Sequence, residues 1–490
     1  MSSSEYEAII GLETHCQLNT ESKIFCTCST TFDSPPNTNV CPVCLGYPGV
    51  LPVLNEEVLA SAVKLGLAIE GQIAPHSKFD RKQYFYPDLP KNYQISQFDL
   101  PIVEHGKLEI EIVDKKTKEV SRKTIGITRL HMEEDAGKLV HAGSERLSGS
   151  THSLVDFNRT GVPLLEIVSE PDLRTGQEAA EYAQELRRLV RYLGISDGNM
   201  QEGSLRCDVN ISVRKKGETK FGTKVEIKNM NSFSAIQKAI EYEIERQIEA
   251  IENGEKIVQE TRLWEEASQR TISMRKKEGS SDYRYFPEPD LPPLEVSAEQ
   301  LENWKNQLPE LPAKKRLRYE EEFGLSAYDA RVLTDDRAVA EYFETAVAGG
   351  GNAKLVANWI SQDIAAYLNN NKLTIAEIAL KAEGLAELVK LIENGTISGK
   401  IAKEILPELL TEGGSPQALV EKKGLIQISD TSAIESLIDE IIAAHPGELE
   451  KYRSGKTNLK GFFVGQVMKK SGGKADPKLT NQLLDQKLQG

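Results

Sequence analysis

The chain has 490 residues, of which 39% are hydrophobic and 27% charged, and its formal net charge is −14. At about 150 residues per domain this length allows about three domains, and the composition excludes a wholly disordered chain, a collagen and a small disulfide-bonded scaffold. No segment approaches the ~18 consecutive apolar residues of a membrane helix, and the acidic start shows no signal or transit peptide. We therefore expect a cytoplasmic protein that has no membrane partner.

Residues 7–18 alternate between apolar and polar side chains, as a β-strand does. This alternation places Leu12 and Cys16 on one face, and Glu13 and His15 on the other. A carboxylate and an imidazole that are two residues apart on one strand face can reach the same point in space, as a metal or catalytic site requires. The alternative is an ordinary polar pair that faces solvent.

Four of the six cysteines follow closely in the sequence, at Cys26, Cys28, Cys41 and Cys44. The Cys-Pro-Val-Cys-Leu-Gly segment resembles a zinc knuckle, in which a tight turn points two thiolates at one metal ion, and the Cys-Thr-Cys segment supplies two more thiolates. Disulfides are disfavoured in a cytoplasmic protein. The pattern therefore predicts a structural Zn²⁺ site with no open position for water. A redox pair or spare thiols are the alternative.

Three further segments with strand-like patterns carry acidic residues. Residues 124–135 end in three successive acids, and residues 203–212 alternate Arg206 and Asp208 with apolar side chains. Glu166 is the most informative, because it lies within an apolar run and a buried carboxylate needs a cation or a metal ion as its partner. These strands could together form an oxygen-rich site with one imidazole, suited to Mg²⁺ and phosphate groups, from Glu13, His15, Glu134, Glu166 and Asp208. Acids scattered over the surface are the alternative.

Familiar nucleotide-binding motifs are absent from the sequence. Residues 454–457 resemble the end of a phosphate-binding loop, but the position of the leading glycine is occupied by Glu450. Any use of ATP would therefore depend on a metal cradle built on the sheet. Residues 79–88 and 282–290 combine aromatic residues with cations that could meet a phosphate or a carboxylate in a ligand cleft, namely Arg81, Lys82 and Arg284.

The character of the chain changes after about residue 290. Six of the 21 prolines fall between Pro287 and Pro312, which predicts a domain boundary, and the sequence beyond it is typical of successive short helices. A second hinge is predicted at residues 412–416. Residues 451–490 contain nine Lys or Arg and two Asp, a local charge of +7. This basic end could bind a phosphate backbone, and a solvated basic surface is the alternative.

Several short motifs lie in order along the chain: Gly11–His15, Lys78–Lys82, Tyr93–Asp99, Leu130–Gly137, Glu202–Asp208 and Val467–Lys469. Together they resemble the B subunit of the tRNA-dependent amidotransferase, which converts Glu-tRNA(Gln), and often Asp-tRNA(Asn), to the amide form. The resemblance implies an α+β fold. It comprises a cradle-like catalytic domain with an antiparallel sheet, similar to glutamine synthetase and guanido kinases (1–294), an all-α helical domain (295–410) and a YqeY-like tRNA-binding tail (411–490).

The resemblance also implies site residues, carried over position by position. The family's Mg²⁺ ligands match His15, Glu134 and Glu166. Glu13 lies beside them in the catalytic set, and Asp208 is a weaker candidate for a second cation. The region where an ammonia channel opens, with the neighbouring substrate site, matches Lys82, Tyr84 and Arg206. Some relatives lack the four cysteines, which fits a structural zinc ion.

The implied activity is ATP-dependent phosphorylation of the side-chain carboxylate of the aminoacyl-tRNA, followed by amidation. Ammonia would come from glutamine through an amidase (glutaminase) partner, the A subunit, and a small C subunit would complete a heterotrimer. One alternative is a zinc-containing tRNA-binding adaptor with no chemistry of its own, and another is a carboxylate-amine ligase that acts on a free amino acid. Convergence of His15 and Glu166 would favour an enzyme over the adaptor.

Overall fold

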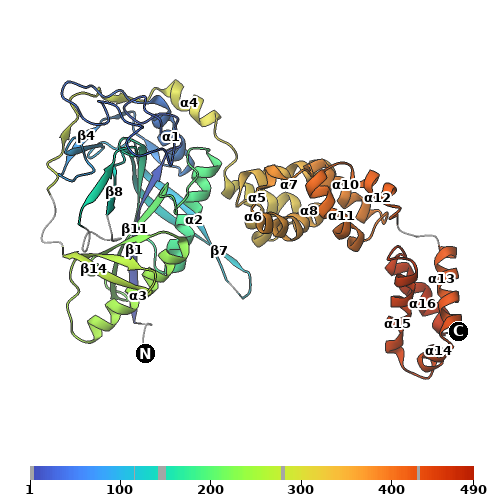
Figure 1. The fold of residues 1–490 in the computed structure, drawn as a ribbon. Helices are drawn as coiled ribbons and strands as arrows, with labels where there is room; N and C mark the ends of the chain where they lie inside the picture. The colour runs from blue at the N-terminus through green and yellow to red at the C-terminus, as the bar shows by residue number, and fades with distance from the viewer. Residues whose placement is uncertain (1–4, 115, 142–150, 277–281, 427–430, 490) are drawn as a thin grey trace. The chain divides into compact units, whose positions relative to one another are not determined.

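The computed structural model describes residues 5–114, 116–141, 151–276, 282–426 and 431–489. The chain forms two compact units, Met1–Lys314 and Lys315–Gly490 (Figure 1). The boundary expected at residue 294 falls inside the first unit, because Leu294 and Trp304 are buried in its core. No helix in the described ranges is both long and apolar enough to cross a membrane.

A nine-stranded sheet forms the centre of the first unit, in the order β14-β13-β12-β11-β1-β10-β7-β6-β2. All neighbouring strands whose pairing is described are antiparallel except β12 and β13, which are parallel. The sheet is therefore mixed, whereas the sequence analysis predicts a purely antiparallel sheet. Helix α3 lies between these two strands in the sequence and provides the crossover that a parallel pair requires. The strands are β1 (Tyr6–Gln17), β2 (Gln72–Ile73), β6 (Val103–Val113), β7 (Val120–Glu134), β10 (Pro163–Ser169), β11 (Leu205–Lys215), β12 (Val225–Met230), β13 (Glu260–Glu265) and β14 (Arg270–Lys276).

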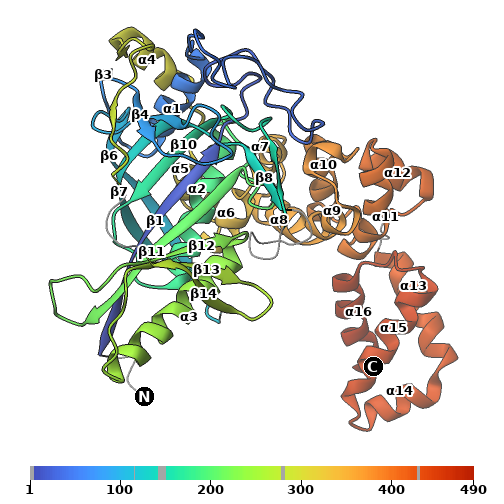
Figure 2. The same ribbon diagram turned by 60° about the vertical axis from the view of Figure 1, so that its left-hand side comes forward.

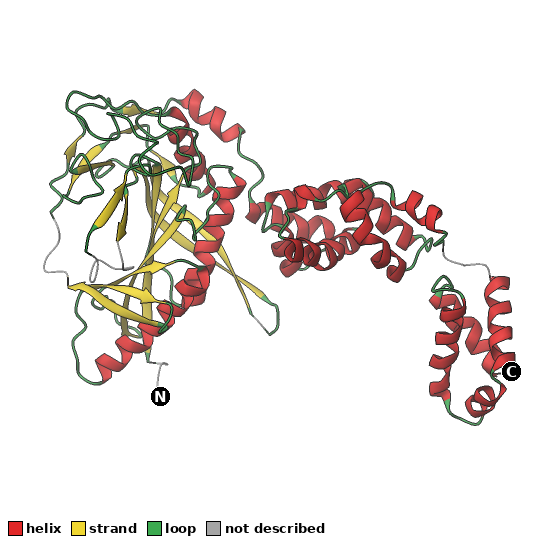
Figure 3. Cartoon of the chain, in the orientation of Figure 1, coloured by secondary structure: helices red, strands yellow, loops and turns green. Residues whose placement is uncertain are grey.

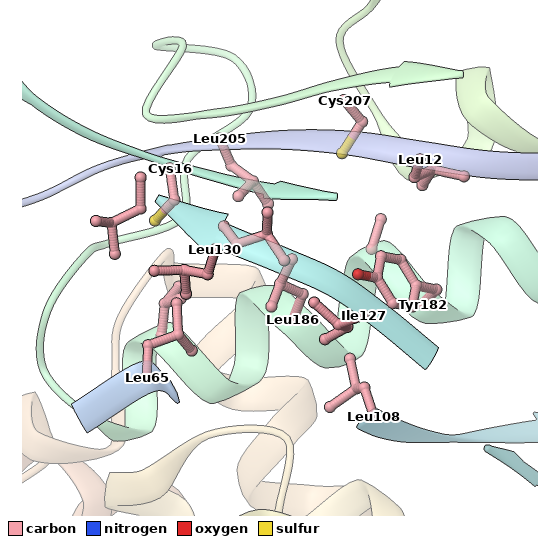
Figure 4. Packing of buried hydrophobic residues seen from close by; sticks show 14 of the residues in the cluster. Leu12, Cys16, Leu65, Leu108, Ile127, Leu130, Tyr182, Leu186, Leu205 and Cys207 are labelled. Carbon is pink, nitrogen blue, oxygen red and sulfur yellow. The ribbon is translucent and has the colours of Figure 1, made fainter. Parts of the chain in front are cut away.

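One face of this sheet carries the hydrophobic core of the first unit. The helices α1 (Glu56–Ala68), α2 (Gly176–Tyr192) and α3 (Phe233–Glu252) pack on that face (Figures 2 and 3). Leu12 and Cys16 of β1 are buried in this core with residues of α2 (Figure 4). Because side chains alternate along a strand, Glu13 and His15 lie on the opposite face.

Smaller elements lie beside the sheet. A three-stranded sheet has the order β15-β4-β5, and its strand β5 contacts β7 of the large sheet. A separate hairpin joins β8 to β9, and a short pair joins β3 to β16. The bounds are β3 (His76–Ser77), β4 (Asp80–Gln83), β5 (Tyr93–Ser96), β8 (Lys138–His141), β9 (Ser153–Asp156), β15 (Phe286–Pro287), β16 (Leu294–Glu295) and the peripheral helix α4 (Ala298–Asn306).

The described part of the second unit is helical and contains two hydrophobic cores. The first core runs from Tyr319 to Val420, and the second from Ile434 to Leu488. The hinge expected at residues 412–416 belongs to the first core, because Val420 is buried there and Ser415 Oγ donates to Glu387 Oε1 at 2.8 Å. The expected tail boundary at residue 411 lies within α11 (Gly399–Glu412), which belongs to the first core, whereas the buried residues of the second core begin at Ile434.

The helices of the second unit are short, as the sequence predicts. They are α5 (Pro312–Phe323), α6 (Ala327–Leu333), α7 (Arg337–Ala348), α8 (Ala353–Trp359), a π-helical turn (Ile360–Ile364), α9 (Ala365–Asn371), α10 (Ala382–Glu393), α11 (Gly399–Glu412), α12 (Pro416–Lys423), α13 (Thr431–Ala444), α14 (Pro446–Arg453), α15 (Lys460–Lys470) and α16 (Pro477–Gln489).

Candidate active site and metal centres

Three side chains converge on the face of the large sheet that lies opposite the helices. In the strand register, His15 of β1 lies opposite Glu166 of β10. His15 Nε2 is 3.3 Å from Glu166 Oε2 and 3.8 Å from Glu133 Oε1. One ligand atom from each of these residues lies within 4.8 Å of the others. The set offers one imidazole and two carboxylates to a divalent cation.

Glu133, and not the expected Glu134, completes this cluster. The two glutamates are neighbours at the end of β7, so their side chains leave the strand in opposite directions. Glu134 pairs with Lys91 and accepts a hydrogen bond from the Ile95 N–H at 2.9 Å. No contact of Glu134 with His15 is seen among the described residues. The structure therefore brings His15 and Glu166 together as expected and leaves Glu134 outside the cluster.

His131 and Ser96 are neighbours of the cluster that the sequence analysis missed. His131 Nε2 is 3.6 Å from Glu166 Oε2 and 3.7 Å from Glu133 Oε2, and Ser96 Oγ donates to Glu133 Oε2 at 3.2 Å. The sequence does contain a signal for this face. Because Leu130 and Met132 are apolar and buried, alternation assigns residues 131 and 133 to the opposite side of β7.

The histidines and the carboxylates of the cluster favour the charged forms of one another. Burial opposes the charged form of His15, but the hydrogen bond to Glu166 and the charge of Glu133 outweigh it and raise the pKa of His15. Burial alone would raise the pKa of Glu166, yet His15, His131 and Lys82 together lower it. Burial also opposes the charged form of Glu133, and the two histidines again outweigh it and lower its pKa. Both carboxylates are therefore ionised near neutral pH, and the site carries the negative charge that a divalent cation needs.

The charge of Glu133 acts on two further residues that the family resemblance singles out, Lys82 and Tyr84. Burial lowers the pKa of Lys82, but the charges of Glu133 and Glu166 reverse the effect and raise it overall. The Lys82 Nζ atom is 5.1 Å from the centre of the Tyr283 ring. Burial and the charge of Glu133 raise the pKa of Tyr84, which stays protonated. The electrostatic field of the cluster therefore acts on a lysine and on a tyrosine.

Glu13, Arg206 and Asp208 lie on the same face, and each already has partners. Glu13 Oε1 accepts from Asn210 Nδ2 at 2.7 Å, and Asp208 pairs with Lys228. Lys228 also lies 3.2 Å from Glu226. In the register of β1 and β11, Arg206 is opposite His15 and Asp208 is opposite Glu13. These residues border the cluster and are not members of it.

A buried carboxylate holds Arg206 in place. Asp135 pairs with Arg206, lies 3.7 Å from Arg159 and accepts from Gln17 Nε2 at 2.6 Å. Burial would raise the pKa of Asp135, but Arg206 and Arg159 outweigh it and lower the pKa. The Arg206 Nε atom is buried and has no hydrogen-bond partner within the described ranges.

The cations that the sequence predicts in the two aromatic segments, Arg81, Lys82 and Arg284, have different surroundings in the structure. Arg81 is engaged by a carboxylate, because its Nε and Nη2 atoms donate to Glu288 at 2.7 and 2.8 Å. Tyr285, next to Arg284, stacks on Phe98 with ring centres 4.1 Å apart. The charges of Glu133 and Glu166 raise the pKa of the third predicted cation, Lys82.

The four cysteines predicted to bind zinc also converge. One sulfur from each of Cys26, Cys28, Cys41 and Cys44 lies within 4.8 Å of the others, and none forms a disulfide. Cys41 and Cys44 Sγ are 3.9 Å apart, close to the ~3.8 Å that two sulfurs span on tetrahedral zinc with Zn–S bonds of about 2.3 Å. The Cys41 N–H donates to Cys44 Sγ at 3.2 Å. The geometry fits one zinc ion with four thiolate ligands.

Comparison with known proteins identifies the family. The model of the "GatB/GatE catalytic domain" matches residues 8–302, and that of the "GatB domain" matches residues 341–488. The B subunit of the aspartyl/glutamyl-tRNA(Asn/Gln) amidotransferase of Gloeothece citriformis (strain PCC 7424) is 85% identical over 99% of this chain and 98% of its own length. Those of Rippkaea orientalis (strain PCC 8801 / RF-1), at 84% over the same shares, and Synechocystis sp. (strain ATCC 27184 / PCC 6803 / Kazusa), at 81% over 98% and 97%, are similar. The chain therefore belongs to the family of aspartyl/glutamyl-tRNA(Asn/Gln) amidotransferase B subunits.

Proposed function

We propose that this chain activates and amidates the side-chain carboxylate of Glu-tRNA(Gln), and of Asp-tRNA(Asn), in an ATP-dependent reaction. The convergence of His15, Glu133 and Glu166 carries this proposal, since an adaptor without chemistry has no need of two carboxylates and an imidazole within 4.8 Å. The high identity to amidotransferases whose names specify aminoacyl-tRNAs favours tRNA over a free amino acid as the substrate carrier.

The chemistry explains why ATP is needed. A free carboxylate resists attack by ammonia because an oxide is a very poor leaving group. Transfer of the γ-phosphoryl group to one carboxylate oxygen breaks the bond to ADP and gives an acyl phosphate, from which phosphate leaves when ammonia attacks the carbonyl carbon. Two anions must approach each other in the first step, so cationic groups at the site are the main requirement.

The residues of the cluster have separate proposed tasks. His15, Glu133 and Glu166 would hold Mg²⁺, which when bound offsets phosphate charge. Ser96 donates to Glu133 and fixes its orientation. Lys82, with its raised pKa, keeps a positive charge beside the cluster and would attract the substrate carboxylate. Glu13 and Asp208 border the site, and Asp208 would take part in a second cation site only after releasing Lys228.

Partners follow from the same reaction. The acyl phosphate must be shielded from water, so ammonia has to arrive by a closed route from the amidase A subunit, which hydrolyses glutamine. We place the end of this route at Lys82 and Tyr84, and Arg206 at the substrate side of the cluster. A small C subunit completes the proposed heterotrimer, which works in the cytoplasm. The catalytic unit would be a cradle of the kind found in glutamine synthetase and guanido kinases.

Two further parts of the chain have proposed supporting roles. The four-cysteine loop would bind a structural Zn²⁺ ion. The helical tail, of which the structure describes residues 431–489, would be the YqeY-like unit that binds the tRNA body. The tail would do no chemistry, because no cluster of potential metal ligands is found among its described residues.

The test of the proposed reaction uses the reconstituted heterotrimer with Glu166→Gln and His15→Ala variants. Both should abolish ATP hydrolysis that depends on Glu-tRNA(Gln), because the Mg²⁺ ligands are lost, while glutamine hydrolysis by the amidase partner continues. Acyl phosphate can be trapped with hydroxylamine as a direct readout. Normal acyl phosphate formation in both variants would refute the assignment.

A further inference from the structure

Lys23 is a fully buried lysine beside the four-cysteine cluster. Its exposed fraction is 0%. Its Nζ atom donates to the carbonyl oxygens of Asn39 at 2.7 Å and Phe157 at 3.4 Å, and to Cys44 Sγ at 3.7 Å. Within the described ranges, Lys23 makes no ion pair with a carboxylate. The sulfur of Cys44 is thus the one acceptor among its partners that can carry a full negative charge.

A buried ammonium group is costly unless an anion lies beside it. Two neutral carbonyl groups satisfy hydrogen bonds but do not neutralise the charge. Four neutral thiols would also leave Lys23 without a counter-ion. Four thiolates on one Zn²⁺ ion carry a net charge of about −2, which supplies the missing anion at the right place.

We propose that Lys23 is an electrostatic component of the metal site, and that zinc retention and the burial of this lysine depend on each other. The proposal deepens the zinc assignment and rests on it. Lys23 offsets half of the excess negative charge of the tetrathiolate, which lowers the free energy of the loaded site. Without zinc the net charge of about −2 beside Lys23 is lost, so the burial of its ammonium group is less well compensated.

Lys23 and its neighbour also connect the four-cysteine loop to the surroundings of the cluster formed by His15, Glu133 and Glu166. The hydrogen bond of Lys23 to Phe157 reaches the turn that precedes β10. The next residue, Ile24, donates its N–H to Gly161 O at 3.0 Å, and Gly161 N–H donates to Asp135 O at 2.9 Å. A chain of hydrogen bonds therefore connects the loop to Asp135, the carboxylate that holds Arg206.

Lys91 provides a matched control. It lines the same cavity of about 200 Å³ as Lys23 and Cys44, and it is also largely buried. Its partner, however, is the carboxylate of Glu134 and not a thiolate. Replacing Lys91 changes the same cavity but leaves the hydrogen bond from Lys23 to Cys44 Sγ in place.

The experiment measures zinc release from the full-length protein in the presence of a chromogenic chelator. Lys23→Met should release zinc about 10- to 100-fold faster than the wild type, the range found for groups that support metal ligands. Lys91→Met should release it at the wild-type rate, and Lys23→Arg, which keeps the charge, should stay close to the wild type. Lys23→Gln serves as a second neutral variant, with the same expected loss, if Lys23→Met does not fold.

A stability measurement gives an independent readout. Removal of zinc should lower the melting temperature more in the wild type than in Lys23→Met, because only the wild type loses the charge of the zinc site that compensates its buried ammonium group. Equal zinc release by the wild type and both neutral variants would overturn the role of Lys23, and so would equal acceleration by Lys91→Met. A wild-type protein that contains no zinc would instead overturn the zinc site itself.

Discussion

Two neighbouring glutamates at the end of β7 show how strongly the face of a strand decides the role of a residue. Glu133 lies 3.8 Å from His15, whereas Glu134 pairs with Lys91 on the other side. We predict that Glu133→Gln abolishes acyl phosphate formation, with a loss of about 100-fold or more. The Glu134→Gln variant should form acyl phosphate at a rate much closer to that of the wild type, because the charge of Glu134 is used in an internal ion pair with Lys91. Hydroxylamine trapping in the heterotrimer distinguishes the two, and a reversed order would restore Glu134 as the ligand.

The buried carboxylate of Asp135 allows a prediction about the free energy of unfolding and its dependence on pH. Its pKa is lowered in the folded protein by Arg206 and Arg159, which outweigh the opposing effect of burial. The ionised Asp135 carboxylate therefore stabilises the folded protein fully above its unfolded pKa of about 3.9. This stabilisation is lost as the pH falls through the pKa that Asp135 has in the folded protein. Asp135→Asn should lower the free energy of unfolding by about 2 kcal/mol at pH 7, less than for a fully buried pair because both arginines are partly exposed.

Unfolding in urea at several pH values tests this prediction. The difference between the wild type and Asp135→Asn should shrink as the pH falls below about 4. A difference that stays constant with pH would mean that the carboxylate charge does not stabilise the fold.

The alternation of a strand is enough to predict part of the site. It places His15 opposite the apolar face of β1, and it singles out Glu166 as a carboxylate that needs a partner. Strand alternation also predicts that residues 131 and 133 share a face. The family resemblance points to Glu134 instead, and the sequence analysis followed the resemblance. The hydrogen bond of Ser96 to Glu133 could not be predicted, because it depends on how separate sheets pack.

At the scale of the element, local sequence signals set the ends of helices well. Thr175 caps α2, since its side chain accepts the Glu178 N–H at 3.1 Å. The parallel pairing of β12 with β13 was not predictable, because strand order depends on long-range packing. The proline-rich segment was expected to separate domains, yet Leu294 and Trp304 pack into the first core.

The four-cysteine loop is an element that depends on its metal. Residues 30–39 of the loop are polar and proline-rich, and Phe32 is 65% exposed, so the loop has little apolar core of its own. We predict that Cys41→Ser lowers the melting temperature by on the order of 5 °C and makes the loop susceptible to proteases, before chemistry is affected. Metal analysis of the wild type should find about one zinc per chain. Unchanged stability in a zinc-free variant would contradict this prediction.

At the scale of the whole molecule, the distribution of charge separates the tail from the rest of the chain. The basic excess predicted for residues 451–490 is partly neutralised inside the tail. Three lysines form ion pairs there: Lys460 with Asp485, Lys470 with Glu440 and Lys487 with Asp439. Four exposed lysines make no ion pair with any described residue and remain available to phosphates, namely Lys451, Lys456, Lys469 and Lys478. The total charge can be counted in the sequence, whereas the pairing of individual cations depends on the fold.

This distinction yields a prediction about tRNA binding. Replacing the four unpaired lysines together by Ala should weaken binding of Glu-tRNA(Gln) to the heterotrimer about tenfold and flatten its dependence on salt, because fewer counterions are released from the RNA. Replacing the three paired lysines should have a smaller effect on both quantities, since their charges are already offset. Glutamine hydrolysis should be unchanged in either variant. Binding measured at several salt concentrations tests the idea, and an unchanged affinity and salt slope in the first variant would reassign the tail as a scaffold.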